Sequence, residues 1–133
     1  MLRKFSLSFF LLTMMLFYSL PAFAAPGENR LNPGEGMNRG HQLVSNNGLY
    51  KLVFQKDGNL VLKGRGTTLW SSNTYAAWAV VMDKNGALTI WTYPVVLWSS
   101  GTHNPGAYLI VQDDGNVVIY KDQTALWSTG TGQ

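Results

Sequence analysis

A short stretch of the chain, residues 112–120, reads Gln-Asp-Asp-Gly-Asn-Val-Val-Ile-Tyr and places a polar turn directly before an aliphatic run. Residues 109–111, Leu-Ile-Val, lead into the turn. An Asp-Gly or Asn-Gly pair between such runs is the strongest short-range signal for a β-hairpin. Similar turns with similar flanks occur at Gly58 and Gly86, so that the three turn glycines, the last being Gly115, are 28 and 29 residues apart. The sequence therefore predicts one hairpin repeated three times.

A second landmark, the tripeptide Leu-Trp-Ser, keeps the same spacing. Its tryptophans are Trp70, Trp98 and Trp127, again 28 and 29 residues apart. Because they stand at equivalent places in every unit, we expect them to pack in the interior; we expect the same of the unrepeated Trp78 and Trp91. The two landmarks define repeats at about 41–72, 73–100 and 101–133 within one domain, residues 25–133.

Each repeat reads as three short strands, and no segment after residue 24 has a sustained helical period. Residues 25–40 are rich in Gly, Pro and Asn and form a lead-in with at most one short strand. The repeats are shorter than those of a β-trefoil. We therefore expect an all-β protein.

The first 24 residues have the pattern of a secretory signal peptide. Arg3 and Lys4 precede an apolar run from Phe5 to Leu20, and Ala22-Phe23-Ala24 offers a cleavage site. An uncleaved N-terminal anchor is the alternative. Cleavage predicts a secreted protein, extracellular or periplasmic in a Gram-negative host, with no membrane insertion afterwards.

Composition excludes several classes of function. The chain has 133 residues, 46% of them hydrophobic, and no cysteine, which excludes disulfide scaffolds, thiolate zinc sites and thiol nucleophiles. Ten basic and seven acidic residues give a net charge of +3, and two of the bases belong to the leader, which leaves +1. The remaining Lys and Arg are scattered along the sequence, so no nucleic-acid partner is expected.

Hairpin geometry decides which side chains share a face. A three-residue loop with Gly in the left-handed position sets Gln55 opposite Asn59 and Gln112 opposite Asn116. The alternation of a strand then adds Val61 and Lys63 to the first pair, and Val118 and Tyr120 to the second pair. Their neighbours in the strand point into the core.

Such a face suits a sugar. Amides and carboxylates can hold a hydroxyl from two sides, and Val with Tyr offers a small apolar shelf for the C–H face of the ring. The competing interpretation is structural, since Asp and Asn in tight turns commonly bond their own backbone. Turn chemistry alone leaves both interpretations open.

Residues 112–120 match in full the Q-x-D-x-N-x-V-x-Y motif of the bulb-type (monocot, snowdrop-like) mannose-binding lectins. The threefold repeat and the Leu-Trp-Ser ends are also similar to that family, from Leu31 to Gln133. The resemblance implies a β-prism II fold of three four-stranded antiparallel sheets with pseudo-threefold symmetry, no metal or other cofactor, and one mannose pocket per sheet. Plant members carry a disulfide-bonded Cys where Gly58 stands, and this chain lacks it.

Carried over position by position, the resemblance implies that Asp114 and Asn116 bind the axial 2-hydroxyl of mannose. Gln112 would bind the 3-hydroxyl and Tyr120 the 4-hydroxyl, with Val118 against the ring carbons. The partners implied are mannose-type sugars or glycans on glycoproteins or cell surfaces.

The other two repeats depart from the motif. The first has Lys63 in place of Tyr, and its pocket consists of Gln55, Asp57, Asn59, Val61 and Lys63. The middle repeat carries Asp83, Asn85, Ala87, Thr89 and Trp91 at the five positions. Ala87 removes an amide and Trp91 is bulkier than Tyr, which makes mannose binding at this degenerate pocket doubtful.

Two functional alternatives differ in their support. Catalysis finds no candidate: His41 and His103 are isolated, and adjacent Asp113 and Asp114 have poor geometry for an acid–base pair. An antibacterial, bacteriocin-like or protein-interaction module on the same fold stays open. Members of the family often pair by exchanging C-terminal strands, which makes a homodimer through residues 127–133 an option.

Overall fold

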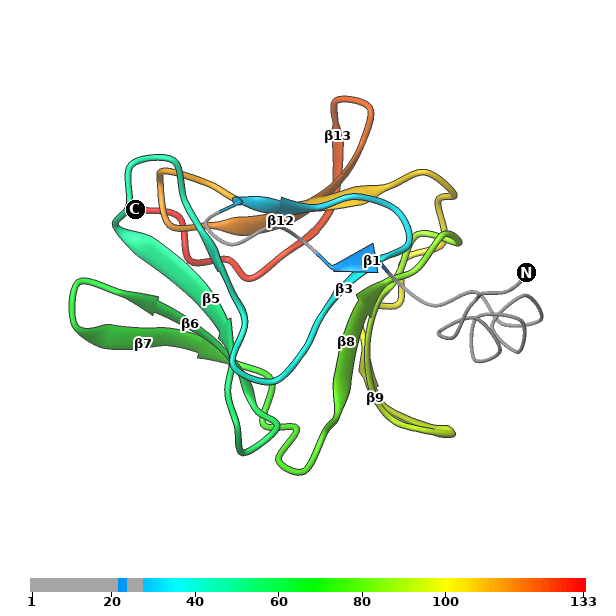
Figure 1. Ribbon diagram of the computed structural model, residues 1–133. Coiled ribbons are helices and arrows are strands. Elements are labelled where there is room, and N and C mark those ends of the chain that lie inside the picture. Colours follow the sequence, from blue (N-terminus) through cyan, green and yellow to red (C-terminus); the bar gives the residue numbers. More distant parts are fainter. Residues whose placement is uncertain (1–21, 24–27) are drawn as a thin grey trace, which may run out of the picture.

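The computed structural model describes residues 22–23 and 28–133, and these residues form strands and turns without a helix (Figure 1). The strands in chain order are β1 (Ala22–Phe23), β2 (Arg30–Leu31), β3 (Glu35–Met37), β4 (Gln42–Val44), β5 (Tyr50–Phe54), β6 (Leu60–Gly64), β7 (Thr67–Ser71), β8 (Ala79–Met82), β9 (Leu88–Thr92), β10 (Val95–Ser99), β11 (Tyr108–Val111), β12 (Val117–Lys121) and β13 (Thr124–Ser128).

These strands form three sheets that face a common interior, like the sides of a triangular prism (Figure 1). The first sheet has the order β4-β5-β6-β7, the middle sheet β3-β8-β9-β10, and the third sheet β13-β12-β11-β2. All pairs within these sets are antiparallel. This confirms the predicted fold of three four-stranded antiparallel sheets. The two-residue β1 adds a parallel strand beside β3.

The prediction of at most one short strand in residues 25–40 is wrong. Two strands lie there, and each completes a different sheet: β2 pairs with β11 and β3 pairs with β8. Leu31 and Met37 on these strands are buried, so each anchors its strand by one apolar side chain. Strands this short have no periodicity to read, and only their distant partners define them.

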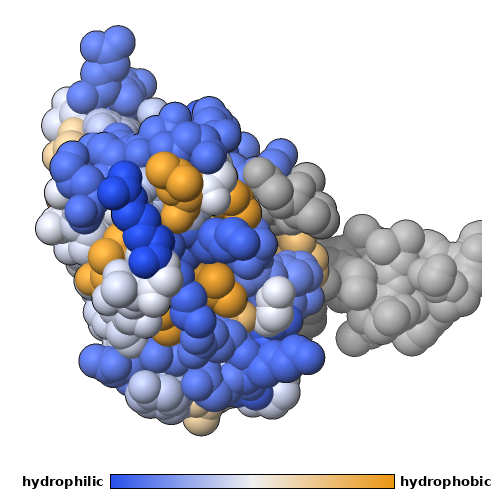
Figure 2. Space-filling view, turned by 90° about the vertical axis from the view of Figure 1, so that its left-hand side faces the viewer, coloured by the Kyte–Doolittle hydropathy of each residue, from blue (hydrophilic) through white to orange (hydrophobic). Residues whose placement is uncertain are grey.

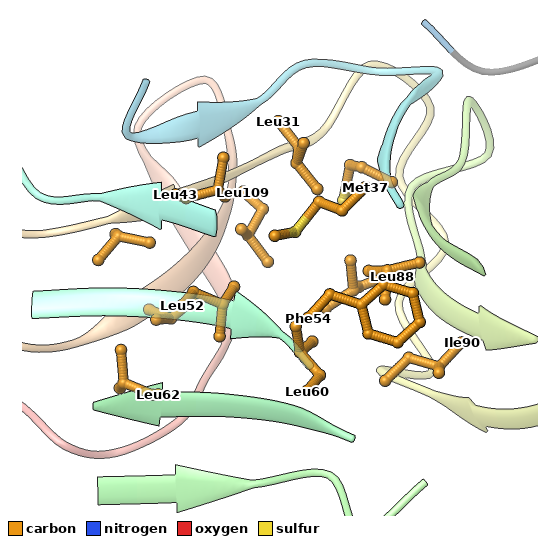
Figure 3. Close-up of a cluster of buried hydrophobic side chains, with 14 of the residues drawn as sticks. Leu31, Met37, Leu43, Leu52, Phe54, Leu60, Leu62, Leu88, Ile90 and Leu109 are labelled. Atoms are coloured by element: carbon orange, nitrogen blue, oxygen red, sulfur yellow. The ribbon is translucent and has the colours of Figure 1, made fainter. Parts of the chain in front are cut away.

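The inward faces of the sheets meet in one hydrophobic core (Figure 3). Strand β5 shows the alternation that makes this possible, since Tyr50, Leu52 and Phe54 are buried while Lys51 is exposed. Side chains from all three sheets converge in the close-up, among them Leu31, Leu62, Ile90 and Leu109. From the side at the left of Figure 1, the surface is mostly hydrophilic and its apolar areas are small and separate (Figure 2).

The three repeated tryptophans pack against one another and against this core, as predicted. Trp70, Trp98 and Trp127 make three edge-to-face pairs with ring centroids 5.5–5.9 Å apart. This T-shaped geometry sets the positive edge of each ring against the negative face of the next ring. The triad therefore joins the outermost strands β7, β10 and β13, one from each sheet.

The two unrepeated tryptophans differ from each other. Trp91 is partly buried, but Trp78 is 62% exposed, so the expectation that it packs inside is wrong. The guanidinium of Arg39 lies 3.5 Å from the Trp78 ring centroid. A cation–π contact at the surface thus takes the place of core packing.

Two further predictions, cleavage of a leader and exchange of C-terminal strands, concern the ends of the chain. The predicted leader, residues 1–24, lies outside the described residues except for β1, and cleavage stays a prediction. Strand β13 pairs with β12 of its own chain, and exchange of C-terminal strands also stays a prediction. Within residues 22–23 and 28–133, no helix has the length and hydropathy needed to cross a membrane.

Candidate functional site

The hairpin between β11 and β12 has the predicted three-residue loop. Val111 pairs with Val117, which places Gln112 opposite Asn116. The backbone N–H of Gln112 donates to the carbonyl of Asn116 (2.8 Å), and the N–H of Gly115 donates to the carbonyl of Gln112 (3.0 Å). Gly115 has a φ of 89°, the left-handed conformation that this turn requires. Gln112 and Asn116 therefore share the outer face of the third sheet.

The two adjacent aspartates in this loop have different partners. Oδ1 of Asp113 accepts a hydrogen bond from the backbone N–H of Asn47 (2.8 Å), which ties the loop to the turn before β5. Oδ1 of Asp114 accepts from the N–H of Asn116 (2.9 Å). The first aspartate is therefore structural, and the second holds its carboxylate against the backbone N–H of Asn116.

The C-terminal segment holds the Asn116 amide in one orientation. Its Oδ1 accepts from Oγ1 of Thr129 (3.1 Å) and from the backbone N–H of Thr131 (3.2 Å). Oγ1 of Thr131 in turn donates to the carbonyl of Gly115 (2.6 Å). With its oxygen held from behind, the amide presents Nδ2 as a donor, for which the described residues supply no partner.

The far end of the face is aromatic. Nε2 of Gln112 donates to the Tyr120 hydroxyl (2.7 Å), which leaves the hydroxyl proton of Tyr120 available for another acceptor. Val118, only 3% exposed, forms the floor between these groups. The ring of Tyr108 lies 6.0 Å from that of Tyr120, and the guanidinium of Arg30 lies 3.9 Å above Tyr108.

The open hydrogen-bonding groups of this face, which we call the third pocket, suit a polyhydroxylated ligand. Within the described residues no hydrogen bond uses Oδ2 of Asp114, Nδ2 of Asn116 or Oε1 of Gln112. A groove of about 390 Å³ adjoins Gln112 and Asp114, and its lining consists of Asn29, Asn46, Ile110, Val111, Gln112, Asp113 and Asp114. In the part of the chain that the structure describes, no group of three His, Asp or Glu side chains is arranged to hold a metal ion.

The first pocket has the same backbone but a different amide. The five predicted residues, Gln55, Asp57, Asn59, Val61 and Lys63, again follow one hairpin. Asn59 is only 4% exposed, and its Nδ2 donates to Oγ of Ser71 (2.9 Å). Its Oδ1 accepts from Oγ of Ser72 (3.1 Å) and from the N–H of Thr74 (3.3 Å). The Nδ2 group that is open in the third pocket is therefore buried here and has one of its two N–H donors bonded.

In the middle sheet the residues at the motif positions form hydrogen bonds within their own hairpin. Oδ1 of Asp83 accepts from the backbone N–H groups of Asn85 (3.0 Å) and Ala87 (3.1 Å). Nε1 of Trp91 donates to Oγ1 of Thr89 (2.8 Å), which stands where the other sheets have the floor valine. The Trp91 indole therefore forms a hydrogen bond with the residue at the floor position. Ala87 stands where the other two repeats have an asparagine.

Sequence reasoning missed the hydroxyl groups behind each turn. After each Leu-Trp-Ser tryptophan, two hydroxyl residues bond each other: Ser72 with Thr74, Ser100 with Thr102, and Thr129 with Thr131. The second residue of each pair is a threonine whose hydroxyl donates to the carbonyl of the turn glycine in the preceding hairpin. The S/T-x-T pattern repeats with the tryptophans and could have indicated this contact.

The fold of three sheets arranged as a prism is shared by solved lectin structures. A monomeric monocot mannose-binding lectin from Gastrodia elata is 35% identical, with a TM-score of 0.73 over 80% of this chain and 100% of that chain. The snowdrop (Galanthus nivalis) mannose-specific agglutinin, solved with methyl-α-D-mannoside, is 31% identical, with a TM-score of 0.62 over 80% and 99%. Fold and relatives together define the class of this protein: it is a lectin, a carbohydrate-binding protein without catalytic activity.

Sequence comparison gives the family. The B-type lectin plumieribetin of Scorpaena plumieri is 30% identical over 107 residues, which cover 76% of this chain and 94% of that protein. The chain belongs to the family of bulb-type, or B-type, lectins. No family model matches the sequence.

Proposed function

We propose that this protein is a secreted lectin that binds mannose or mannose-containing glycans, chiefly through the third pocket. The observation that carries the proposal is the open Nδ2 donor of Asn116 beside the open Oδ2 acceptor of Asp114. A sugar hydroxyl both donates and accepts, so one hydroxyl can satisfy this pair at once. The axial 2-hydroxyl of mannose stands out from the ring and suits two converging partners.

The other groups of the pocket support the same placement of the ring. With the 2-hydroxyl at Asp114 and Asn116, the ring carbons would lie on Val118. Oε1 of Gln112 would accept from the 3-hydroxyl, and the Tyr120 hydroxyl would meet the 4-hydroxyl. The pocket is shallow, so water competes for its groups and a single site binds weakly; glycans that engage several sites gain by avidity.

Binding to immobilised mannose tests the proposal. We expect the protein to be retained in the presence of a metal chelator, because the open groups of the pocket are side-chain donors and acceptors. Free mannose should elute it. Free glucose, which differs only in its configuration at C2, should elute much less. Equal elution by both sugars, or loss of retention with the chelator, would contradict this account.

A further inference from the structure

The charged residues are scattered along the sequence but unevenly shared among the sheets. Residues 41–72 contain four bases, Lys51, Lys56, Lys63 and Arg65, against the single acid Asp57. Residues 101–133 contain one base against three acids, and residues 73–100 contain one of each. A chain that is nearly neutral after its leader thus has a cationic first repeat and an acidic third repeat.

Two of these bases are set directly against each other. Lys51 on β5 pairs with Lys63 on β6, and both side chains are exposed on the outer face of the first sheet. Like charges directly opposite in a sheet are destabilising. Within the described residues neither ammonium group forms an ion pair. In the third sheet the equivalent pair is Tyr108 with Tyr120, and in the middle sheet it is Ala79 with Trp91.

The acid of the same hairpin is too far away to neutralise this pair. Asp57 lies in the turn beyond Asn59, and Asn59 is four strand residues from Lys63, about 13 Å. Charges at the surface separated by more than about 8–10 Å are largely screened at physiological salt. The lysine pair therefore presents a double positive charge that the acid of its own hairpin does not neutralise.

The rest of this face has an apolar floor like that of the third pocket, but its amide is bonded within the protein. Val61 is the buried floor, and Val53 pairs with it on the neighbouring strand. Val61 and Lys63 are two residues apart, about 7 Å, which a hexose with an exocyclic substituent can span. The Asn59 amide is only 4% exposed, and one of its two N–H donors is bonded to Ser71.

We propose that the outer face of the first sheet binds sugars that carry an anionic group, a phosphate, sulfate or carboxylate. The ring would lie on Val53 and Val61, and the anionic group between the ammonium groups of Lys51 and Lys63. Lysine is a compact, mobile charge with three donors, which suits a tetrahedral anion. This inference rests on the proposed function only in taking the outer faces of the sheets as the sugar-binding faces.

Amide chemical-shift mapping of the isotope-labelled protein tests it, with mannose, mannose 6-phosphate and inorganic phosphate as separate probes. We expect mannose 6-phosphate to shift Val61 and Lys63 and to bind the first sheet about tenfold tighter than mannose. The double variant Lys51→Gln/Lys63→Gln should lose this gain, and Lys51→Arg/Lys63→Arg should keep it. Lys84→Gln, a charge removal on the middle repeat, is the matched control. Mannose 6-sulfate and mannuronate then distinguish the anionic groups.

Two results would overturn the inference. Inorganic phosphate that binds the first sheet as tightly as mannose 6-phosphate would define a plain anion site. Mannose 6-phosphate binding that is absent from the first sheet, or unchanged in Lys51→Gln/Lys63→Gln, would remove the role of the lysine pair. Resonances of Asn116 and Val118 report the third pocket separately, so failure of mannose there would count against the proposed function alone.

Discussion

Replacement of Asn116 by alanine is expected to lower the affinity for mannose at least about tenfold, since a lost hydrogen bond that leaves a charged or buried partner unsatisfied costs about 1.5–3 kcal/mol. The substitution removes the Nδ2 donor beside Asp114. It also removes the Oδ1 acceptor that holds Thr129 and Thr131. Asn116→Asp keeps the Oδ1 acceptor but replaces the Nδ2 donor by a carboxylate oxygen and adds a negative charge near Asp114, so it should lose at least as much binding.

Titration calorimetry with methyl-α-D-mannoside, together with retention on immobilised mannose, measures the effect. Thr131→Val is the matched control, because it removes the hydrogen bond from the C-terminal segment to Gly115 and leaves Nδ2 in place. We expect this variant to keep most of the binding. If it lost as much as Asn116→Ala, loosening of the C-terminal segment would explain the loss. Full retention by both Asn116 variants would place the sugar elsewhere.

Gly58→Ala is expected to be among the most destabilising single-methyl changes in the hairpin turns. A Cβ at Gly58 would lie 2.3 Å from the backbone nitrogen of Ala77 and 2.6 Å from that of Ala76. Gly58 also has a φ of 87°, which costs an L-residue about 1–2 kcal/mol. Overpacking adds about 1–3 kcal/mol, so we expect a total loss of about 3 kcal/mol in the free energy of unfolding.

Thermal unfolding with Gly66→Ala as the matched control separates the two contributions. Gly66 has a similar φ of 79°, but a Cβ there would meet nothing within 4 Å. We expect Gly66→Ala to cost about 1 kcal/mol, the conformational part alone. Gly58→Ala should lower Tm by roughly 12 °C, at about 4 °C per kcal/mol for a domain of this size. Equal effects of the two substitutions would show that the close approach of the chains at Gly58 is relieved at little cost.

The turn at Gly58, where the resemblance implies a disulfide-bonded Cys in plant members, is held to a neighbouring segment by hydrogen bonds. The segment after β7 lies directly against the turn: the N–H of Ala76 donates to the carbonyl of Asp57 (2.8 Å), and Oγ1 of Thr74 donates to the carbonyl of Gly58 (3.1 Å). These two hydrogen bonds join the turn to the segment after β7.

Much of the fold could be predicted because its information is local. The turn at Gly115 and the aliphatic runs beside it specify a hairpin, and the recurring glycines and tryptophans specify its repetition. Strands β2 and β3 could not be predicted, since their two or three residues are defined by pairing with β11 and β8, far along the chain.

The candidate site, too, could be predicted only in part from the sequence. Strand alternation places Gln112, Asn116 and Val118 on one face, and the structure brings them together there. The position of Lys51 opposite Lys63 in the first sheet follows from the same predicted loop, which sets Gln55 opposite Asn59. The hydrogen bond from Asn59 to Ser71 joins the hairpin to another strand and could not be predicted from the hairpin sequence alone.

A crystal structure of the protein with methyl-α-D-mannoside tests the central claim most directly. The account predicts the sugar on the outer face of the third sheet, its 2-hydroxyl between Oδ2 of Asp114 and Nδ2 of Asn116 and its ring against Val118. A fully occupied sugar at another place, with these two groups still facing solvent, would contradict it.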